Sequence, residues 1–384
     1  MKARLESMEI RKFRNVAPGT RLEFNDGINV LLGLNATGKT TLLDLLAMAV
    51  CGEFGPLQKE EFDISYRVHH GSARADVSIS NARVAGRDVA GLLGGVTTEV
   101  SWKVALTWTG PQGEPKEWHL ESQPADRPFK VGWLAMCLTH SGLWPEPADT
   151  LPLQLRFDES LEFFTRMSGR DVELAPRLEV EKERPWSWLL LPEDARAALK
   201  GHAAAVTADD IRLARTDVPA FLRKLMPLLG LVDASMSMVW WDADHGRPRY
   251  KGLKFVLDDG FRQFPESHLS YGQKRLLAFF YYSACSDVII ADELVNGMHH
   301  SWIRACLDEI GDRQAFLTSQ NSLLLDHVPV RSPQEAQKTF IICKRDGETL
   351  RWQNVDADTA RDVFEAREVG IQQLSEILIA RDLW

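Results

Sequence analysis

Residues 28–50 read INVLLGLNATGKTTLLDLLAMAV, and this stretch decides the fold class of the chain. Ile28 to Leu32 is a short apolar run typical of a buried strand, and Leu42 to Val50 has the apolar pattern of a helix. Between them, Gly33 to Thr40 reads GLNATGKT and fits the pattern G-x-x-x-x-G-K-[ST]. A strand, a glycine loop and a helix in this order predict an α/β fold with a phosphate-binding loop.

The chemistry of such a loop is local. Glycines let backbone N–H groups turn toward phosphate oxygens, and the helix N-terminus adds the positive end of its dipole. Lys39 supplies a cation to the β- and γ-phosphates, and Thr40 is placed to give its hydroxyl to Mg²⁺. A glycine turn with a structural role alone is the alternative, which the GKT register after a strand disfavours. The residues predicted to contact ATP here are Asn35, Ala36, Thr37, Gly38, Lys39, Thr40 and Thr41.

A second group of motifs lies in the C-terminal half. Leu269 to Arg275 reads LSYGQKR, and the helical pattern Leu276 to Cys285 follows it. The apolar run Val288 to Ala291 then leads into Asp292 and Glu293. In P-loop ATPases an aspartate at a strand end holds Mg²⁺, and a following carboxylate can orient or deprotonate the attacking water. The order of these motifs argues against the alternative, an ordinary strand with an acidic turn.

These motifs together resemble RecF/SMC-type ABC ATPases. LSYGQKR is similar to the ABC signature, and Asn35 gives the G-x-N-x-x-G-K-T form of RecF/SMC-like heads. The N-terminal MEIRKFRNV resembles their opening strands. Asn296 to His299 and the C-terminal ILIARDLW resemble the stand-alone members related to the OLD-family ATPase domain and to ATPase subunits of bacterial anti-phage systems. The resemblance covers roughly residues 1–80 and 235–384, and the middle carries no motif of this kind.

The resemblance implies roles for further residues. Ser270 and Gly272, with Gln273, would face a nucleotide held by the P-loop of another subunit, which implies a homodimer; assembly beyond the dimer is left open. Asp292 and Thr40 would hold Mg²⁺, and Glu293 would act on the attacking water. Arg14 would lie by the adenine or ribose, as matching positions do in similar heads.

One position departs from the family pattern. Members usually carry T-T-H-S after the next strand, where the histidine contacts the γ-phosphate. Here the strand Ala315 to Leu317 runs into Thr318 to Ser322, and Gln320 stands where that histidine is expected. A glutamine can donate a hydrogen bond but cannot carry a charge, so we expect Gln320 in the catalytic site and slow hydrolysis. A one-residue shift of the alignment is the alternative.

The sequence between the glycine loop and the LSYGQKR stretch shows two different hydrophobic patterns. Residues 62–134 alternate polar and apolar positions, which predicts antiparallel strands of a β-subdomain. Residues 155–232 turn helical, with Asp158 as an N-cap and Gly230 as a C-cap, and no sustained heptads follow, so a long coiled coil is not expected.

We predict an α/β, ABC-type P-loop NTPase head with an antiparallel β-subdomain and a helical insertion lobe. The expected division is 1–150 for an N-terminal ATPase lobe with P-loop and β-subdomain, 151–235 for the helical insertion, and 236–384 for a C-terminal ATPase lobe with signature, Asp-Glu strand and C-terminal helix.

Two hairpins and a helix are expected in the C-terminal part. Val239 to Asp242 pairs with Leu253 to Leu257, and Phe340 to Cys343 pairs with Leu350 to Trp352. Gly370 to Leu383 places its apolar residues on one helical stripe.

The composition of the chain argues against several classes of protein. The 384 residues carry a net charge of −9, no run of about 18 apolar residues and no secretory signal, so a cytoplasmic protein without a membrane partner is expected. The five cysteines are odd in number and lack C-x-x-C spacing, which predicts neither a disulfide framework nor a zinc hook. The negative charge argues against a broad DNA-coating surface. Contact with nucleic acid is left open, with no residue assigned; the small basic clusters are Arg11, Lys12 and Arg14, and Lys274 with Arg275.

Three functions remain open at this point. The first is an ATP-hydrolysing switch or scaffold for a separate effector, such as a nuclease, in anti-phage defence. About 60 residues follow Gln320, too few for the metal-binding domain of an OLD nuclease, which favours a separate effector. The second is a RecF-like ATPase of DNA repair or recombination. The third is the nucleotide-binding subunit of a transporter, which Asn35 and the segment Asn296 to His299 disfavour.

Overall fold

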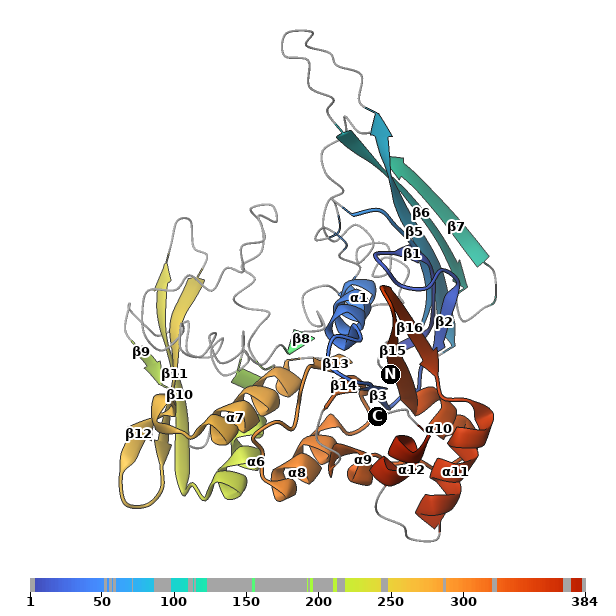
Figure 1. The fold of residues 1–384 in the computed structure, drawn as a ribbon. Coiled ribbons are helices and arrows are strands. Elements are labelled where there is room, and N and C mark those ends of the chain that lie inside the picture. The colour runs from blue at the N-terminus through green and yellow to red at the C-terminus, as the bar shows by residue number, and fades with distance from the viewer. Residues whose placement is uncertain are drawn as a thin grey trace. The chain divides into compact units, whose positions relative to one another are not determined.

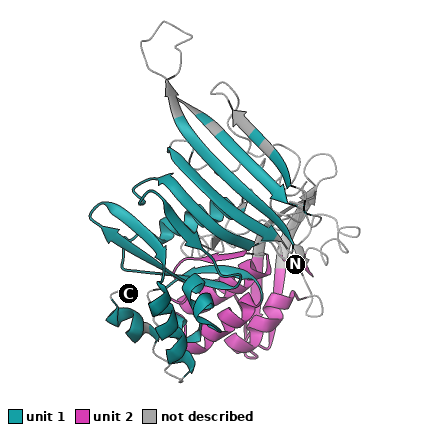
Figure 2. Cartoon of the chain, turned by 90° about the vertical axis from the view of Figure 1, so that its right-hand side faces the viewer, with its two compact units in different colours: residues 1–147, 312–384 teal, residues 148–311 magenta. Residues whose placement is uncertain are grey.

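The computed structural model describes residues 4–51, 54, 57, 60–70, 72–85, 98–109, 113, 115–122, 154–155, 192, 194–195, 210–212, 218–242, 248–285, 288–319, 323–368 and 374–381. The chain forms two compact units (Figure 2). Unit 1 comprises Met1–Pro147 and Asp312–Trp384, and unit 2 comprises Ala148–Gly311. The division into three lobes stays a prediction.

The elements of each unit have these bounds (Figure 1). Unit 1 contains β1 Arg4–Phe13, β2 Thr20–Glu23, β3 Ile28–Leu32, α1 Lys39–Cys51, β4 Phe62–His70, β5 Ala73–Ala85, β6 Thr98–Thr109, β7 Pro115–Ser122, β14 Gln314–Thr318, α9 Leu323–His327, α10 Pro333–Thr339, β15 Phe340–Asp346, β16 Thr349–Asn354, α11 Ala357–Glu368 and α12 Leu374–Ala380. Unit 2 contains β8 Gln154–Leu155, β9 Asp210–Arg212, α6 Ala220–Leu229, β10 Asp233–Asp242, β11 Pro248–Asp258, β12 Gln263–Pro265, the 3-10 helix η3 Glu266–His268, α7 Tyr271–Ala284, β13 Val288–Ala291 and α8 His300–Ile310.

A mostly parallel group of strands forms the core of unit 1. β3 pairs in parallel with β14 on one side and with β15 on the other, and β15 forms an antiparallel hairpin with β16. All residues of β3 and β14 are buried, as expected for parallel strands covered on both faces. The predicted strand Ile28 to Leu32, the helix after the loop and the hairpin of β15 and β16 are therefore confirmed.

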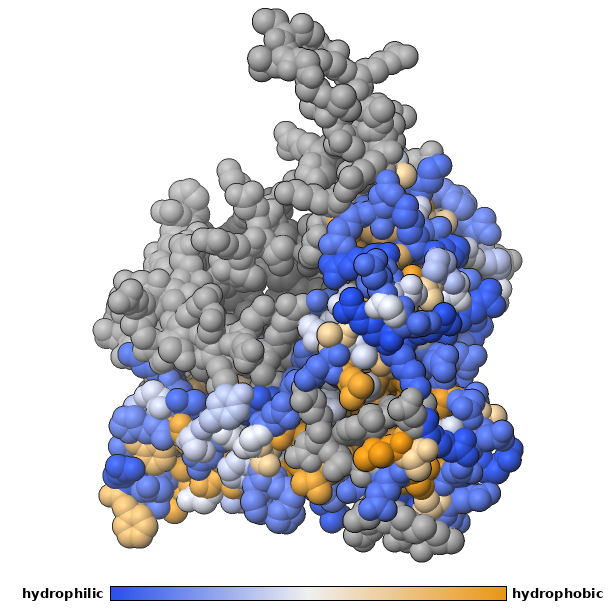
Figure 3. All heavy atoms as spheres, viewed as in Figure 1, coloured by the Kyte–Doolittle hydropathy of each residue, from blue (hydrophilic) through white to orange (hydrophobic). Residues whose placement is uncertain are grey.

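The second sheet of unit 1 is antiparallel, in the order β2-β1-β4-β5-β6-β7 (Figure 1). Along β4, Phe62, Ile64, Tyr66 and Val68 are buried, while the residues between them are half-buried. Alternate residues of a strand point to opposite faces, so the alternation seen in the sequence marks one covered and one open face. On the face of the molecule drawn in Figure 3, the described part of this sheet shows mostly hydrophilic side chains. The predicted β-subdomain is confirmed.

Unit 2 contains an antiparallel sheet in the order β12-β11-β10-β9, and a parallel pairing of β13 with β8. The expected hairpin is confirmed as the antiparallel pair of β10 and β11, but its register differs from the prediction: Val239 to Asp242 pair with Pro248 to Lys251, and Lys254 to Leu257 pair with Ala234 to Ser237. An aromatic cluster links this sheet to the helices: Phe221 of α6, Phe255 of β11 and Tyr281 of α7 have ring centroids 5.5–6.2 Å apart in edge-on pairs. These buried rings anchor α7 within unit 2.

The helical reading of residues 155–232 is partly confirmed and partly wrong. α6 ends at Gly230, whose left-handed backbone (φ 68°) is the predicted C-cap. Asp210 to Arg212, in contrast, form the strand β9, because β10 offers them a free edge: Ser237 pairs with Arg212. Tertiary pairing outweighs local helix preference there. The predicted cap Asp158 lies outside the described residues.

Two further expectations concern helices. The longest helix among the described residues is α7, with 14 residues, and no coiled coil appears in that part of the chain. None of the helices in the described ranges is long and apolar enough to span a membrane. The predicted C-terminal helix is confirmed as α12, with Leu374 and Leu378 fully buried.

Candidate nucleotide-binding site

The glycine loop leaves β3 and turns sharply before α1 begins at Lys39. Three residues of the loop have a positive φ: Gly33 (141°), Ala36 (63°) and Gly38 (83°). Glycine reaches such angles without steric cost, whereas Ala36 adopts a conformation that is uncommon for a residue with a Cβ. The loop therefore has the tight turn expected of residues 33–38.

Distant strands explain why two of these positions need glycine. A Cβ on Gly33 would lie 2.1 Å from the carbonyl oxygen of Cys343 in β15, and one on Gly38 would lie 2.7 Å from Cδ1 of Leu350 in β16. Such distances are far inside van der Waals contact. The hairpin of β15 and β16 thus packs directly against the loop, and the glycines serve this packing as well as any contact with phosphate.

Trp352 of β16 supports the loop by a hydrogen bond. Its side chain is buried, and its Nε1–H donates to the carbonyl oxygen of Thr37 at 3.1 Å. The hydroxyl of Thr37 in turn donates to the carbonyl oxygen of Leu34 at 2.7 Å. Sequence reasoning placed Trp352 in a strand but missed this role. The sequence feature that could have indicated this role is a tryptophan at an inward-facing position of a strand. A buried indole N–H needs a hydrogen-bond acceptor, and here the acceptor is in the loop.

Lys39 spans the loop from the first turn of α1. The side chain is 7% exposed, and Nζ donates to the carbonyl oxygens of Gly33 at 2.7 Å and Leu34 at 2.9 Å. Residues 33–41 contain no acidic side chain. An ammonium group, a helix N-terminus and backbone amides, in a loop that carries no carboxylate of its own, form a donor set that fits a polyphosphate.

The remaining loop residues lie at the surface or near it. Asn35, Ala36 and Thr40 are exposed, and Thr41 is half-buried. Among the described residues no group of three or more His, Cys, Asp or Glu side chains could hold a metal ion. Mg²⁺ bound to nucleotide needs no such cage, since it keeps phosphate and water ligands and takes only one or two from the protein. A single hydroxyl from Thr40 fits that pattern.

In unit 2, the signature stretch begins α7. Ser270 is the N-cap: its hydroxyl accepts from the backbone N–H of Gln273, and the side-chain oxygen of Gln273 accepts from the backbone N–H of Ser270 at 2.9 Å. This reciprocal pair is a capping box, which satisfies two free N–H groups at the helix start. Ser270 stays exposed at this end. Gln273, predicted to contact nucleotide, has this local structural use in the chain.

The start of α7 packs against the segment that follows β13. A Cβ on Gly272 would lie 2.4 Å from the carbonyl oxygen of Gly297 and 3.3 Å from Cζ3 of Trp302. Gly297 has a φ of 73°, and a Cβ there would lie 3.0 Å from the ring of Tyr271. Both glycines are therefore fixed by close contact between the signature and the N-G-M-H segment.

Asp292 and Glu293 follow β13, as predicted, and both are half-buried. Glu293 has a φ of 51°, a left-handed conformation rare for this residue type. Its carboxylate accepts from Nδ2 of Asn296 at 2.9 Å, and its carbonyl oxygen accepts from the guanidinium of Arg275. Unit 2 thus brings together the signature stretch, Glu293 and Asn296, whereas the loop residues belong to unit 1.

Two family models match the chain. One, described as an AAA domain, matches residues 7–114 and includes the glycine loop. The other, described as an AAA domain, putative AbiEii toxin of a Type IV TA system, matches residues 147–326 and includes the signature, Asp292 and Glu293. Both matches are to AAA domains, and they support the resemblance to RecF/SMC-like ABC-type ATPases. The resemblance inferred from the motifs is confirmed.

Comparison with solved structures returns further similarities to this ATPase. An SMC head bound to the C-winged helix domain of ScpA is 12% identical, with 93% of this chain and 99% of that chain covered and a TM-score of 0.48. The SMC head domain from Thermotoga maritima is 10% identical, with 92% and 99% covered and a TM-score of 0.41. The recombination mediator protein RecF with ATPrS is 12% identical, with 92% and 99% covered and a TM-score of 0.37. No curated protein matches the sequence.

The N-terminal basic cluster of the ATPase is largely paired with acids. Arg14 donates to both carboxylate oxygens of Glu60, at 2.6 and 2.7 Å, and this contact lowers the pKa of Glu60. Arg11 donates to Asp63 at 3.0 Å. Lys12 pairs with Glu61. The cluster is locally neutralised, and a contact between Arg14 and the base or ribose, which stays a prediction, would have to share the guanidinium with Glu60.

Two further residues considered from the sequence are Gln320 and Arg275. Gln320 lies outside the described residues, so its place opposite the γ-phosphate stays a prediction. Arg275 is 2% exposed, so its guanidinium does not form part of a nucleic-acid surface in this conformation.

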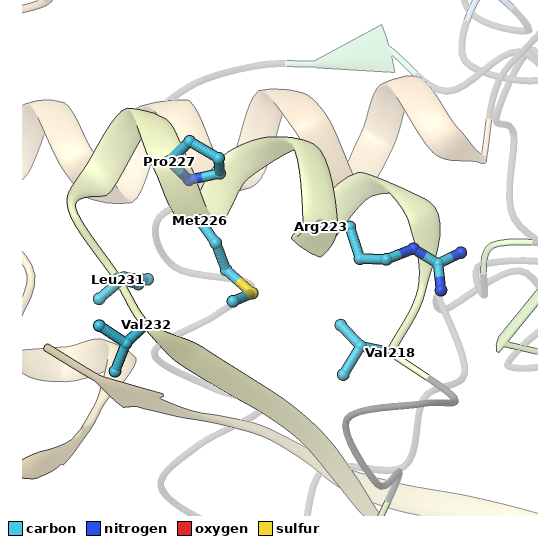
Figure 4. Close-up of a pocket in the computed structure, with 6 residues that line it drawn as sticks. All are labelled: Val218, Arg223, Met226, Pro227, Leu231 and Val232. Carbon is cyan, nitrogen blue, oxygen red and sulfur yellow. The ribbon is translucent and has the colours of Figure 1, made fainter. Parts of the chain in front are cut away.

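A separate hollow of the ATPase lies in unit 2, beside α6 (Figure 4). It has a volume of about 490 Å³, and its lining residues are apolar apart from one arginine. The lining residues are Val218, Arg223, Met226, Pro227, Leu231 and Val232. In Figure 4 the side chain of Met226 points into the hollow and that of Arg223 extends away from it. None of the motif residues lines this hollow.

Proposed function

We propose that the ATPase binds ATP with Mg²⁺ and pairs head to tail with a second copy. ATP bound to Lys39, Thr40 and Asp292 of one chain is closed over by Ser270 and Gly272 of the other. The observation that carries the nucleotide part is the loop itself, where Lys39 lies at the start of α1 among backbone groups of a stretch, residues 33–41, that contains no acidic residue. The support for pairing is the signature stretch, which in similar ATPases acts on a nucleotide of another subunit.

Glu293 carries the hydrolytic step as a base or water-orienting group. Its carboxylate accepts from Nδ2 of Asn296, which holds the side chain in one direction. Mg²⁺, when bound, neutralises the charge that develops on the phosphate oxygens. The γ-phosphate contacts groups of both chains, so the closed dimer binds ATP more tightly than the open one does. Hydrolysis removes that bridge and reopens the pair.

The closed dimer acts as a switch or scaffold for a separate effector, a nuclease, in anti-phage defence. The match of residues 147–326 to a model described as a putative AbiEii toxin supports a role in a defence or toxin system. A RecF-like role in DNA repair is the alternative, and ATP-dependent affinity for DNA would favour it. The pairing of Arg11, Lys12 and Arg14 with acids gives the free chain no basic stripe at this place, which favours the first role.

The test is Glu293→Gln, because an amide keeps the shape of the side chain but cannot accept a proton. We expect this variant to accumulate an ATP-bound dimer, seen by light scattering as a doubling of mass on addition of ATP with Mg²⁺. Wild type should show a transient shift that decays as ATP is consumed. Glu365→Gln, at an exposed position of α11, is the matched control and should behave as wild type.

Lys39→Ala should abolish both binding and the shift. The proposal is wrong if neither wild type nor Glu293→Gln shows an ATP-dependent change in binding or in mass. A permease or a recombination protein as the stable partner, in place of a nuclease, would redirect the biological role but leave the ATPase cycle unchanged.

A further inference from the structure

A buried arginine joins the signature stretch to the catalytic segment within unit 2. Arg275 lies on the first turns of α7 and is 2% exposed. Its Nη1 donates to the hydroxyl of Tyr271 at 2.7 Å, and its Nη2 donates to the backbone carbonyl oxygen of Glu293. The guanidinium also lies 5.4 Å from the centroid of the Tyr271 ring. One planar group therefore holds both segments, which a lysine ammonium cannot do with the same geometry.

The segment at one end of this link is the strained turn of Glu293. A left-handed φ of 51° is uncommon for a residue with a long side chain and persists where surrounding contacts hold it. Arg275 holds the carbonyl oxygen of this residue, while Asn296 holds its carboxylate and also donates its backbone N–H to the same carbonyl oxygen at 3.3 Å. The direction of the Glu293 carboxylate thus depends on these two partners.

The segment at the other end is the part of the signature that would meet a nucleotide. Tyr271 lies between Ser270 and Gly272, and its ring packs over Gly297. A shift of this turn by a few tenths of an ångström would move the Tyr271 hydroxyl and with it Arg275. The close contact of Gly272 with the Gly297 carbonyl leaves no slack to absorb such a shift.

We propose that Arg275 is a positioning residue that links the signature end of α7 to Glu293 of the same chain. Engagement of Ser270 and Gly272 by ATP on the partner then orients Glu293 toward the ATP of its own loop. This regulation rests on the proposed function above. In the proposed dimer, each ATP lies between the loop of one chain and the signature stretch of the other, so the link through Arg275 couples the two ATP sites. Hydrolysis should therefore be cooperative in ATP, with a Hill coefficient between one and two for two sites.

The experiment compares Arg275→Lys, Arg275→Met and Tyr271→Phe with wild type. Arg367→Lys is the matched control, because the guanidinium of Arg367, which is half-buried, also donates to backbone carbonyl oxygens, those of Leu325 and Val328. For each variant we would measure the thermal midpoint, the Kd for ATP, kcat, KM and the Hill coefficient. Tyr271→Phe removes one hydroxyl and keeps the ring, so it folds even if Arg275→Met does not.

A positioning role predicts a split between turnover and binding. Arg275→Met should lower kcat by roughly tenfold or more, the effect of one lost charge-assisted hydrogen bond, while the Kd of ATP on Lys39 stays within about twofold. Arg275→Lys should recover part of kcat. Tyr271→Phe should keep most of kcat but bring the Hill coefficient toward one. Arg367→Lys should lower the thermal midpoint and leave the kinetic constants unchanged.

Other results overturn the proposal in distinguishable ways. If wild type hydrolyses ATP cooperatively, but Arg275→Lys and Tyr271→Phe keep its kcat and Hill coefficient, the link is wrong and the ATPase function stands. A wild-type Hill coefficient of one also rejects the coupling. If all variants, the Arg367 control included, lose activity only in proportion to thermal stability, Arg275 is structural alone. Absence of any ATP-dependent assembly or hydrolysis in wild type and Glu293→Gln rejects the underlying function.

Discussion

Replacement of Gly33 by alanine is the sharpest test of how the nucleotide loop is held. Gly33 follows Leu32 of β3, which pairs with Ile342 of β15. The next residue of β15 is Cys343, whose carbonyl oxygen lies 2.1 Å from the position of the added Cβ. This oxygen belongs to a strand held between β3 and β16, so it cannot move away as a flexible side chain could.

The cost has two parts. A φ of 141° lies in a region where residues with a Cβ are rarely found, which costs about 1–3 kcal/mol. Relief of the contact requires a backbone shift of β3 or β15, which costs about 1–3 kcal/mol more, as for other overpacked interiors. We therefore expect a loss of about 4 kcal/mol in the free energy of unfolding. For a unit of this size, that corresponds to a fall of about 8–16 °C in the thermal midpoint.

Gly347→Ala is the matched control. Gly347 also has a left-handed φ of 60°, in the turn between β15 and β16, but an added Cβ would meet nothing within 4 Å. Its cost should be about 1–2 kcal/mol, from the backbone conformation alone. The difference between the two variants therefore isolates the contact with Cys343.

The assay combines thermal unfolding with titration of a fluorescent ATP analogue. The Gly33 carbonyl oxygen is an acceptor of Lys39, so a displaced loop should also misplace the ammonium and weaken nucleotide binding at least tenfold. Gly347→Ala should bind as wild type does. Equal stability and equal affinity of the two variants would refute the view that β15 fixes the loop.

Three further predictions follow from the same geometry. Trp352→Phe removes the hydrogen bond to Thr37, worth about 1 kcal/mol, and leaves a smaller ring at a buried position, so it should lower stability and raise the Kd for nucleotide about fivefold; an unchanged Kd would contradict it. Burial raises the pKa of the Cys343 thiol to about 12, so peptide mass spectrometry should find Cys343 unalkylated at pH 8 until denaturant is added, and labelling in the folded state would count against it. Arg14 lowers the pKa of Glu60, so their pair stabilises the fold above about pH 4.5 and its contribution is lost as the pH falls through the lowered pKa. Glu60→Gln should thus lower stability at pH 7 by at most about 1 kcal/mol, and its effect should shrink as the pH falls through the lowered pKa of Glu60; a larger loss in acid than at pH 7 would reverse this reasoning.

Local patterns in the sequence predicted the elements that carry the motifs. The strand Ile28 to Leu32 and the strand Val288 to Ala291 have the expected bounds, because buried parallel strands appear as short continuous apolar runs. The cap at Gly230 was predictable for the same kind of reason, since a left-handed residue ending a helix is usually glycine. These features depend on a few neighbouring residues and carry their own signals.

The contacts that shape the site depend on residues far apart and carry no such signal. Nothing near Asp210 to Arg212 marks them as a strand, because their partner is the edge of β10 and their own segment reads as helical. The pairing of Arg14 with Glu60 crosses from β1 to the start of β4 and could not be inferred from spacing. Trp352, more than 300 residues after the loop it supports, was recognisable as a strand residue only.

Both motif regions share one design, which explains the kind of residue that each requires. In the loop, Gly33 is needed because a carbonyl oxygen of β15 lies against it. In the signature, Gly272 is needed because the carbonyl oxygen of Gly297 lies against it. Each of these glycines contacts a protein carbonyl oxygen on one side. The backbone N–H groups around it can still point toward a ligand on the opposite side, so one residue can serve both close packing and phosphate binding. It follows that substitutions in β15 or in the segment after Glu293 should alter nucleotide chemistry without touching nucleotide, because these parts of the chain support the glycines that we propose contact it.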